Sequence, residues 1–281
     1  MRSAAPANFL KGKENDMLIR KLLTGGAVFL SPSTWAAFSN NRTSSGAADG
    51  ATVKELKKKL IVSNRILERE KLVDPFGHVS VRIPGTETFL ITRSIAPGMA
   101  ALDDVVVCDM NGKVLKGKYD RTYSEVVIHT EVYKKRKDIH SVIHSHSPYV
   151  IALSMTDNTI VPANLTAIGI GPQPIALYKR QVFIDTPRLA QEVCDLFGPN
   201  KAVILKGHGA VIVGKNIENA TYTAKRLEYT AMLQWMAISV GKLVPITEEE
   251  KQRVIEFQEK MDKLGSAYQR EWEYLEYALK K

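Results

Sequence analysis

A glycine-rich turn between two short apolar segments places the strongest constraint on how this chain folds. The segments Ala202–Leu205 and Ala210–Val213 are separated only by the sequence Lys-Gly-His-Gly. Flanking glycines allow a tight turn and a close approach of the backbone that a larger residue would hinder. The pattern predicts two strands joined by a turn that carries one histidine, His208.

The remaining segments alternate between helical and extended patterns from residue 51 onward. Apolar residues at helical spacing predict helices at Thr52–Glu70, Ser124–Arg136 and Ile217–Val240, and a mostly helical charged segment at Thr247–Leu279. Short apolar or alternating runs predict strands near residues 79–83, 89–91, 105–107 and 141–146. The Asn-Gly pair in Asp109–Gly112 indicates a hairpin. These elements predict a mixed α/β fold with an antiparallel sheet flanked by helices.

Composition and charge narrow the class of protein. The chain has 281 residues, 44% of them hydrophobic, which is enough for one large domain with its own core. No run approaches the roughly 18 apolar residues of a membrane span, so no such span is expected. Residues 1–60 hold ten basic and four acidic side chains and so carry most of the net charge of +9. The rest is nearly balanced, and nucleic-acid binding is not expected.

The first 50 residues differ in character from the rest. The stretch Met17–Ala37 has a paired basic start, a weakly apolar run and then small residues. This pattern resembles a cleavable export signal, but a disordered extension also fits, so the expected location is cytoplasmic, or periplasmic if the stretch is cleaved. We expect an extension at residues 1–50, a metal-binding domain at 51–245 and a helical extension at 246–281. The last is either a solvated helix or a flap over a neighbouring site.

Two histidines on one predicted strand form the first part of a candidate metal site. His144 and His146 are two residues apart, and side chains two apart on a strand point to the same side. The same alternation places Val142 on that side and Ile143 on the other. His208 offers a third imidazole. Three neutral imidazoles with open positions are typical of a catalytic site for zinc, with manganese or cobalt as alternatives.

A competing interpretation is that these are ordinary core or surface histidines. The other histidines of the chain lack this spacing. We therefore expect them to have structural roles or to contact the metal ligands without binding the ion. They are His78, His129 and His140.

Glu125 is the candidate group for proton transfer. It lies at the start of a predicted helix, with Ser124 before it as the expected N-cap. Glu125 and His129 are four residues apart and share one helix face. A carboxylate beside a metal can move protons at carbon if burial raises its pKa towards the working pH. The alternative is that Glu125 is only a capping charge.

Five phrases occur together in a fixed order over roughly residues 52–245. They are Gly77-His-Val-Ser-Val-Arg82, Phe89-Leu-Ile-Thr-Arg93, Ser124-Glu125 with His129, Val142-Ile-His-Ser-His-Ser-Pro148 and Leu205-Lys-Gly-His-Gly-Ala210. In these phrases the chain resembles the class II aldolase/adducin family. The resemblance implies an α/β/α sandwich of three layers with a mainly antiparallel central sheet. It also implies a homotetramer with sites at the subunit interfaces.

The resemblance assigns roles to individual residues. It implies that His144, His146 and His208 ligate zinc, and that Glu125 is the acid/base. His129 is expected to be the second catalytic residue, one that positions Glu125. Sugar-phosphate aldolases of this family have Gly-Asn-x-Ser where residues 77–80 are Gly-His-Val-Ser, and a Thr/Gly-rich turn where Arg93 and Ser94 lie. An imidazole and a guanidinium suit a planar carboxylate better than a phosphate. The expected substrate-binding residues are His78, Ser80, Arg93 and Ser124.

This variant resembles the branch of the family that contains decarboxylases of hydroxylated aromatic or pyridine carboxylic acids. The expected activity is a divalent-metal-dependent carbon–carbon lyase acting on a non-phosphorylated hydroxy- or oxo-carboxylate, a small molecule. Decarboxylation and retro-aldol cleavage both leave the electron pair of the broken carbon–carbon bond on the substrate. A bound cation stabilises the enolate or phenolate that results. One alternative is a sugar-phosphate aldolase or epimerase. Another is a non-catalytic oligomerisation module like the adducin head domains, which lack the three histidines.

Overall fold

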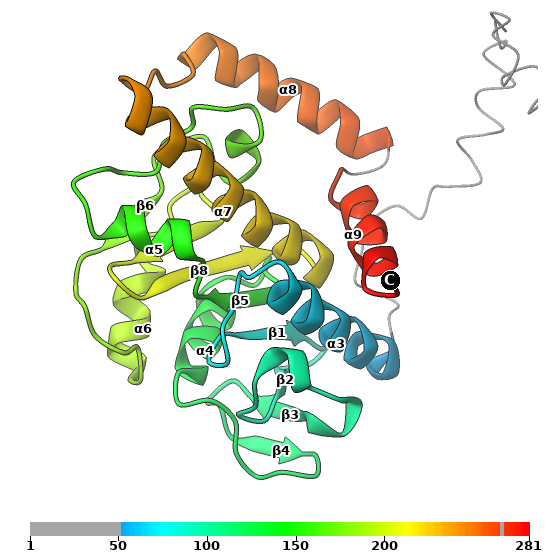
Figure 1. Cartoon of the computed structure of the whole chain (residues 1–281). Helices are drawn as coiled ribbons and strands as arrows, with labels where there is room; N and C mark the ends of the chain where they lie inside the picture. The colour runs from blue at the N-terminus through cyan, green and yellow to red at the C-terminus, as the bar shows by residue number, and fades with distance from the viewer. Residues whose placement is uncertain (1–51, 265–266) are drawn as a thin grey trace, which may run out of the picture. The chain divides into compact units, whose positions relative to one another are not determined.

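An eight-stranded sheet forms the centre of the computed structural model, which describes residues 52–264 and 267–281 (Figure 1). The strands are β1 (His78–Arg82), β2 (Thr88–Thr92), β3 (Val105–Asp109), β4 (Val114–Lys116), β5 (Ser141–Ser145), β6 (Ala176–Tyr178), β7 (Ala202–Leu205) and β8 (Gly209–Gly214). They lie in the order β4-β3-β2-β1-β5-β8-β7-β6. Neighbouring strands are antiparallel, except that β6 and β7 are parallel. The predicted mainly antiparallel sheet is confirmed.

Helices cover both faces of this sheet. They are α3 (Val53–Arg69), α4 (Val126–Lys135), α5 (Pro148–Ser154), α6 (Pro187–Cys194), α7 (Ile217–Val240), α8 (Glu248–Leu264) and α9 (Ala267–Ala278). Short 3-10 turns lie at Pro97–Met99, Leu102–Asp104 and Ala167–Gly169. Helices α3, α5 and α7 pack on one face and α4 and α6 on the other (Figure 1). The predicted α/β/α sandwich is therefore confirmed.

Several strands divide their apolar side chains between two cores. On β5, Val142 packs into the core under α4 and α6, whereas Ile143 packs into the core under α3, α5 and α7. On β8, Val211 and Ile212 divide in the same way. The opposite orientation predicted for Val142 and Ile143 is confirmed. By the same alternation His144 lies on the α4 side of the sheet.

The local sequence explains where α3 begins. The Thr52 hydroxyl accepts the backbone N–H of Glu55, and the Glu55 carboxylate accepts the backbone N–H of Thr52. This reciprocal capping box satisfies two N–H groups that the first turn leaves unpaired. The predicted apolar stripe of this helix is buried: Leu56, Leu60, Ile61 and Leu67. The predicted hairpin is also present between β3 and β4, with Gly112 at a φ of 81°.

One expectation requires correction, and three short elements were not predicted. Glu125 itself occupies the N-cap position of α4 without a side-chain capping bond, and Ser124 lies exposed before it, so the predicted Ser124 cap is wrong. The expectation that Thr247–Leu279 is mostly helical is confirmed, and the segment consists of two helices, α8 and α9. The elements α5, α6 and β6 were not predicted, because three to eight residues give too few turns or alternations to define a period.

The C-terminal helix α9 is attached through an aromatic side chain. Trp272 and Leu275 are buried against Ile66 of α3, whereas Tyr274 and Tyr277 are exposed. None of the described helices combines the length and apolar character needed to cross a membrane. The predicted export-signal stretch, Met17–Ala37, lies outside the described residues.

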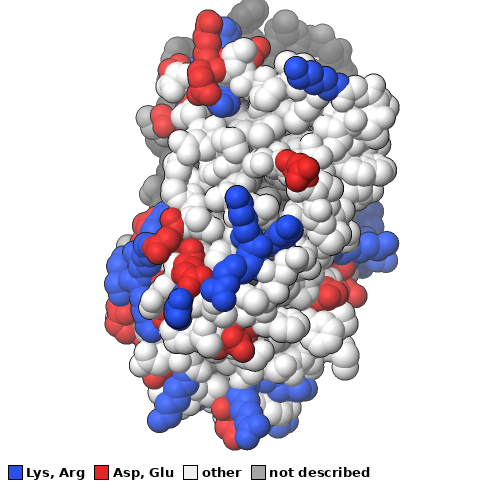
Figure 2. Space-filling view, turned by 90° about the vertical axis from the view of Figure 1, so that its left-hand side faces the viewer, with Lys and Arg blue, Asp and Glu red and all other residues white. Residues whose placement is uncertain are grey.

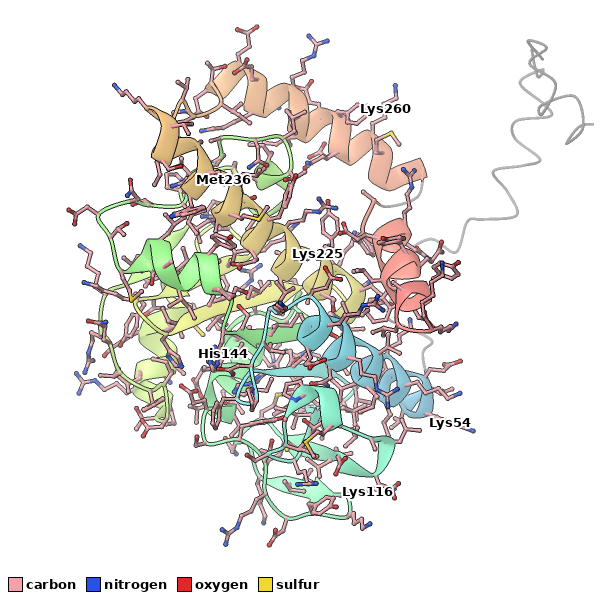
Figure 3. All side chains as sticks on the ribbon, in the orientation of Figure 1. Lys54, Lys116, His144, Lys225, Met236 and Lys260 are labelled. Carbon is pink, nitrogen blue, oxygen red and sulfur yellow. The ribbon has the colours of Figure 1, made fainter. Side chains whose placement is uncertain are left out.

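Charged side chains are dispersed over the face shown in Figure 2. Basic and acidic groups alternate there with broad uncharged areas, and no continuous basic strip crosses this face. Figure 3 places His144 inside the domain, whereas Lys54, Lys116 and Lys260 extend from its periphery. These lysine side chains therefore lie on the surface, whereas His144 lies at the sheet.

Candidate metal centre

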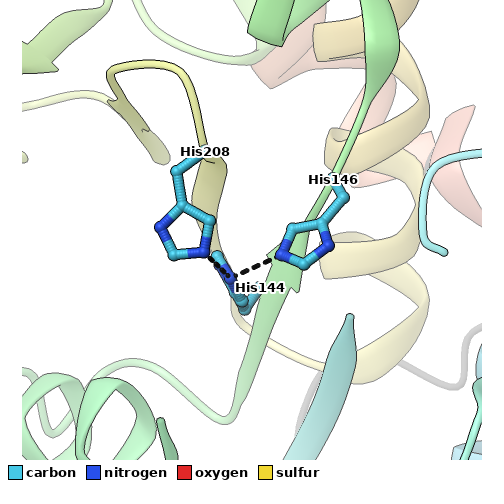
Figure 4. A group of neighbouring side chains, drawn as sticks. All are labelled: His144, His146 and His208. Carbon is cyan, nitrogen blue, oxygen red and sulfur yellow. Dashed lines mark hydrogen bonds between the residues drawn. The ribbon is translucent and has the colours of Figure 1, made fainter. Parts of the chain in front are cut away.

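Three imidazoles meet at one end of the sheet (Figure 4). His144 lies on β5, His146 follows the last residue of that strand, and His208 lies in the turn between β7 and β8. The Nε2 atom of His144 is 2.9 Å from Nε2 of His146 and 3.3 Å from Nε2 of His208. Residues far apart in sequence meet because β5 pairs directly with β8. The structure thus brings together the three predicted ligands.

Hydrogen bonds on the outer side of two rings direct their Nε2 lone pairs to a common point. Nδ1 of His146 donates to the Asp74 carboxylate at 2.7 Å, and Nδ1 of His144 donates to the carbonyl oxygen of Ala210 at 3.2 Å. Because a neutral imidazole carries one proton, both Nε2 atoms are then unprotonated. Two lone pairs at this spacing repel each other unless a cation lies between them.

The spacing also fits a divalent ion. Nitrogen ligands about 2.0–2.1 Å from a tetrahedral zinc ion lie about 3.3 Å from one another. Three imidazoles and one nearby carboxylate form a donor set suited to zinc, manganese or cobalt. The residues present therefore fit the metal that the sequence predicts.

Two glycines shape the turn that carries His208. Gly207 has a φ of 63°, in the left-handed region that favours glycine. A Cβ atom on Gly209 would lie 1.9 Å from the carbonyl oxygen of Ser145. The predicted tight turn and close approach of the Gly-His-Gly segment are both present, and they bring His208 against β5.

Gly209→Ala is expected to destabilise the protein and weaken metal binding together. The added methyl group forces β8 away from β5, an overpacking that costs about 1–3 kcal/mol and moves His208 as well. Thermal unfolding and zinc titration measure the two effects. Gly241→Ala is the control, since nothing lies within 4 Å of its added Cβ. An unchanged melting temperature for Gly209→Ala would contradict this account.

The unpredicted helix α5 links the two segments that carry the ligands. It begins two residues after His146, and its Ser154 hydroxyl accepts the backbone N–H of Gly207 at 2.9 Å. At its other end, the Glu228 carboxylate accepts the backbone N–H groups of Tyr149 and Val150. Pro148 at the first helical position is the signal from which this helix was predictable. No local pattern marks Asp74, Ser154 or Glu228.

Glu125 lies beside the imidazoles. One carboxylate oxygen, Oε2, is 3.6 Å from Nε2 of both His144 and His208, and the other accepts the backbone N–H of Ile184 at 2.7 Å. Burial acts to raise the pKa of Glu125, as expected, but the neighbouring imidazoles and the Ile184 N–H outweigh it and lower the pKa to about 2. The raised pKa that was the condition for proton transfer is therefore not found, and Glu125 is a carboxylate at neutral pH.

Three predicted site residues lie in a buried group behind His144. His78 is the register partner of His144 across β1 and β5, and its Nδ1 is 2.7 Å from Nε2 of His129. The Ser80 hydroxyl is 2.6 Å from Nδ1 of His129 and 2.7 Å from the Tyr133 hydroxyl. Burial lowers the pKa of His129 to about 3 and also holds the pKa of His78 well below its usual range. Both imidazoles are therefore neutral.

The other two predicted substrate contacts lie outside this group. Arg93 donates from Nε to the Asp104 carboxylate at 2.7 Å, and its guanidinium lies 4.5 Å over the Tyr119 ring. Asp104 raises the pKa of Arg93. Ser124 is exposed. Within residues 52–264 and 267–281, neither Arg93 nor Ser124 forms a hydrogen bond with the three imidazoles.

A cavity of about 460 Å³ lies beside Asp74. Its walls come from the end of α3, residues 73–75 and residues 96–99. Asp74 therefore contacts both this cavity and His146.

Comparison with known proteins agrees with this geometry. Residues 58–235 match the family model described as Class II Aldolase and Adducin N-terminal domain. A 3-oxo-tetronate 4-phosphate decarboxylase of Haemophilus influenzae is 30% identical over 173 residues, which are 59% of this chain and 80% of that protein. A 3,4-dihydroxyphthalate decarboxylase of Arthrobacter keyseri is 29% identical over 191 residues, 63% of this chain and 76% of that protein.

The fold comparison adds an aldolase. A solved structure of an L-fuculose 1-phosphate aldolase has a TM-score of 0.67 and 25% sequence identity, covering 75% of this chain and 98% of that one. The relatives thus include decarboxylases as well as aldolases, both of which are lyases. The resemblance seen in the five sequence phrases is confirmed. The chain belongs to the class II aldolase/adducin family.

Proposed function

We propose that this protein is a zinc-dependent decarboxylase of a non-phosphorylated hydroxy- or oxo-carboxylate. The observation that carries the proposal is the convergence of three Nε2 atoms beside the Glu125 carboxylate. His144, His146 and His208 would hold the ion, with manganese or cobalt as alternatives. When bound, the ion supplies Lewis acidity towards the electrons left by carbon–carbon cleavage.

Glu125 would transfer the proton that the substrate carbon needs after cleavage. When carbon dioxide leaves, the substrate carbon keeps the electron pair of the broken bond and needs one proton. Because the pKa of Glu125 is about 2, its carboxylate must first take a proton, from a substrate hydroxyl group or from water. It would then return that proton to carbon. The Ile184 N–H fixes one of its oxygens, which leaves Oε2 for this transfer.

The position of His78 favours a substrate that carries a carboxylate. It lies opposite His144 in the strand register, where an N–H donor would reach a substrate oxygen near the metal. Arg93 would bind the outer end of a carboxylate through the guanidinium nitrogens that its Asp104 pair leaves available. Ser124, exposed at the start of α4, would contribute a hydroxyl group. Ser80 and His129 lie behind His78 and would act indirectly.

The test is product analysis on the zinc-loaded protein. A panel of hydroxylated aromatic carboxylates and hydroxy acids, with and without a phosphate group, is assayed for carbon dioxide and for aldehyde. We expect carbon dioxide from a non-phosphorylated member, and the same panel with manganese and cobalt identifies the metal. Aldehyde without carbon dioxide would instead establish retro-aldol cleavage, and turnover of phosphorylated members alone would overturn the substrate class.

Retro-aldol cleavage or epimerisation of a sugar phosphate is the second candidate. The fold match to an L-fuculose 1-phosphate aldolase favours it, and the Haemophilus relative is named for a phosphorylated substrate. The homotetramer that the family implies is also a proposal. Phe76 and Phe183, 72% and 74% exposed, lie beside Asp74 and His208, where a neighbouring subunit would cover them.

A further inference from the structure

A continuous chain of hydrogen bonds runs from the core under α4 to the metal centre. Its members are Tyr133, Ser80, His129 and His78, in that order, joined at 2.7, 2.6 and 2.7 Å. All four side chains are buried, with at most 1% of any one exposed. At the inner end the Arg82 guanidinium lies over the Tyr133 ring. At the outer end a ring nitrogen of His78, an oxygen of Glu125 and a ring nitrogen of His144 lie within 4.8 Å of one another.

The direction of the chain follows from counting its protons. The Tyr133 hydroxyl contacts the Ser80 hydroxyl and also accepts the backbone N–H of Val142, so Ser80 is the partner that can accept the phenol proton. If Ser80 donated to Tyr133, the buried phenol proton would have no acceptor, which costs about 1–3 kcal/mol. If both Tyr133 and His129 donated to Ser80, the serine proton would be stranded in the same way. Burial also raises the pKa of Tyr133, so the phenol keeps its proton.

One arrangement satisfies every group. Tyr133 donates to Ser80, Ser80 donates to Nδ1 of His129, and Nε2–H of His129 donates to Nδ1 of His78. Because Nδ1 of His78 accepts a hydrogen bond, the single proton of this neutral ring lies on Nε2. Nε2 has no hydrogen-bond partner among the described residues, and a ring nitrogen of His78 lies within 4.8 Å of ligand atoms of Glu125 and His144.

We propose that Tyr133, Ser80 and His129 are positioning residues that fix His78 as an Nε2–H donor to an anionic oxygen of the substrate. This inference rests on the proposed function for the identity of that oxygen, a carboxylate or the enolate or phenolate oxygen formed on cleavage. The tautomer itself is independent of the reaction. It also excludes His78 from the metal, because a protonated nitrogen is no ligand. The ion is therefore assigned to His144, His146 and His208, not to the second group of His78, Glu125 and His144.

The tautomer is measured directly by nuclear magnetic resonance of the ¹⁵N-histidine-labelled, zinc-loaded full chain. Long-range proton–nitrogen correlations separate a protonated ring nitrogen from an unprotonated one, and His78→Gln assigns the signals of His78. We expect Nε2 of His78 to be protonated and Nδ1 to be unprotonated. Protonated Nδ1 would overturn the proposal whether or not the protein is an active decarboxylase.

Ser80→Ala breaks the chain at its centre. We expect His78 to lose its single tautomer and kcat/KM to fall about tenfold, the size of one lost hydrogen bond, with zinc affinity unchanged. The control is Ser141→Ala, which removes an equally buried hydroxyl that donates to the Ser80 carbonyl oxygen outside the chain.

An unchanged His78 tautomer in Ser80→Ala would overturn the role of the chain, as would equal losses of activity in the two variants. A wild-type protein with the expected tautomer but no turnover of any carboxylate would instead refute the proposed function alone.

Discussion

His208→Ala should lower kcat/KM by about 1,000-fold and remove tightly bound zinc. The reason is that the variant deletes one of three converging nitrogens, and a Lewis acid contributes several kcal/mol, with each 1.36 kcal/mol worth tenfold in rate. Zinc content of the purified protein and the rate of carbon dioxide release measure the two losses. A chelator applied to the wild-type protein should reproduce the loss of activity, and added zinc should restore it.

The matched control for this experiment is His140→Ala. His140 precedes β5 and is partly buried, but it lies outside the group of converging imidazoles. That variant should keep its zinc and most of its activity. If His208→Ala retained both metal and turnover, the metal centre would have to be assigned to other residues.

Glu125→Gln should lower kcat by about 100- to 10,000-fold, the usual contribution of a positioned proton-transfer group. The amide oxygen of glutamine can still accept the Ile184 N–H, so the side chain should stay in place. Only the ability to take and return a proton at Oε2 is lost. Zinc affinity should change much less than kcat, because the three imidazoles remain. Steady-state kinetics and zinc titration separate these effects.

Glu131→Gln is the control on the same helix. Glu131 is buried and contacts Lys134 and Gln191, away from the imidazoles. Its replacement should leave kcat within about twofold, since side chains away from the reacting atoms have small effects. Full activity of Glu125→Gln with zinc bound would show that another group transfers the proton.

The parts of the site that sequence could predict are those fixed by local geometry. His144 and His146 are two residues apart at the end of one strand, and the flanking glycines of His208 favour a tight turn, so both features were predictable from short segments. The layered fold followed in the same way from helical and alternating apolar patterns. Such local rules operate over only a few residues.

The contacts that sequence could not predict join distant segments. Asp74 reaches His146 across 72 positions, and Gly207 reaches Ser154 across 53. These partners meet only after the strand order and register are fixed. The low pKa of Glu125 has the same origin, because the imidazoles that lower it come from β5 and the β7–β8 turn. Burial does act to raise the pKa of Glu125, but the imidazoles and the backbone N–H of Ile184 lower it by more.

The helix α5 gives the metal centre a consequence for folding. A divalent ion held by His146 and His208 would act as a crosslink between two segments that α5 already ties together through Ser154. Since the unfolded chain has no such converging donors, the free energy of metal binding adds to the free energy of unfolding. At an ion concentration 1,000 times the dissociation constant the gain is about 4 kcal/mol. Metal supply in the cell would thus regulate the lifetime of the folded protein as well as its activity.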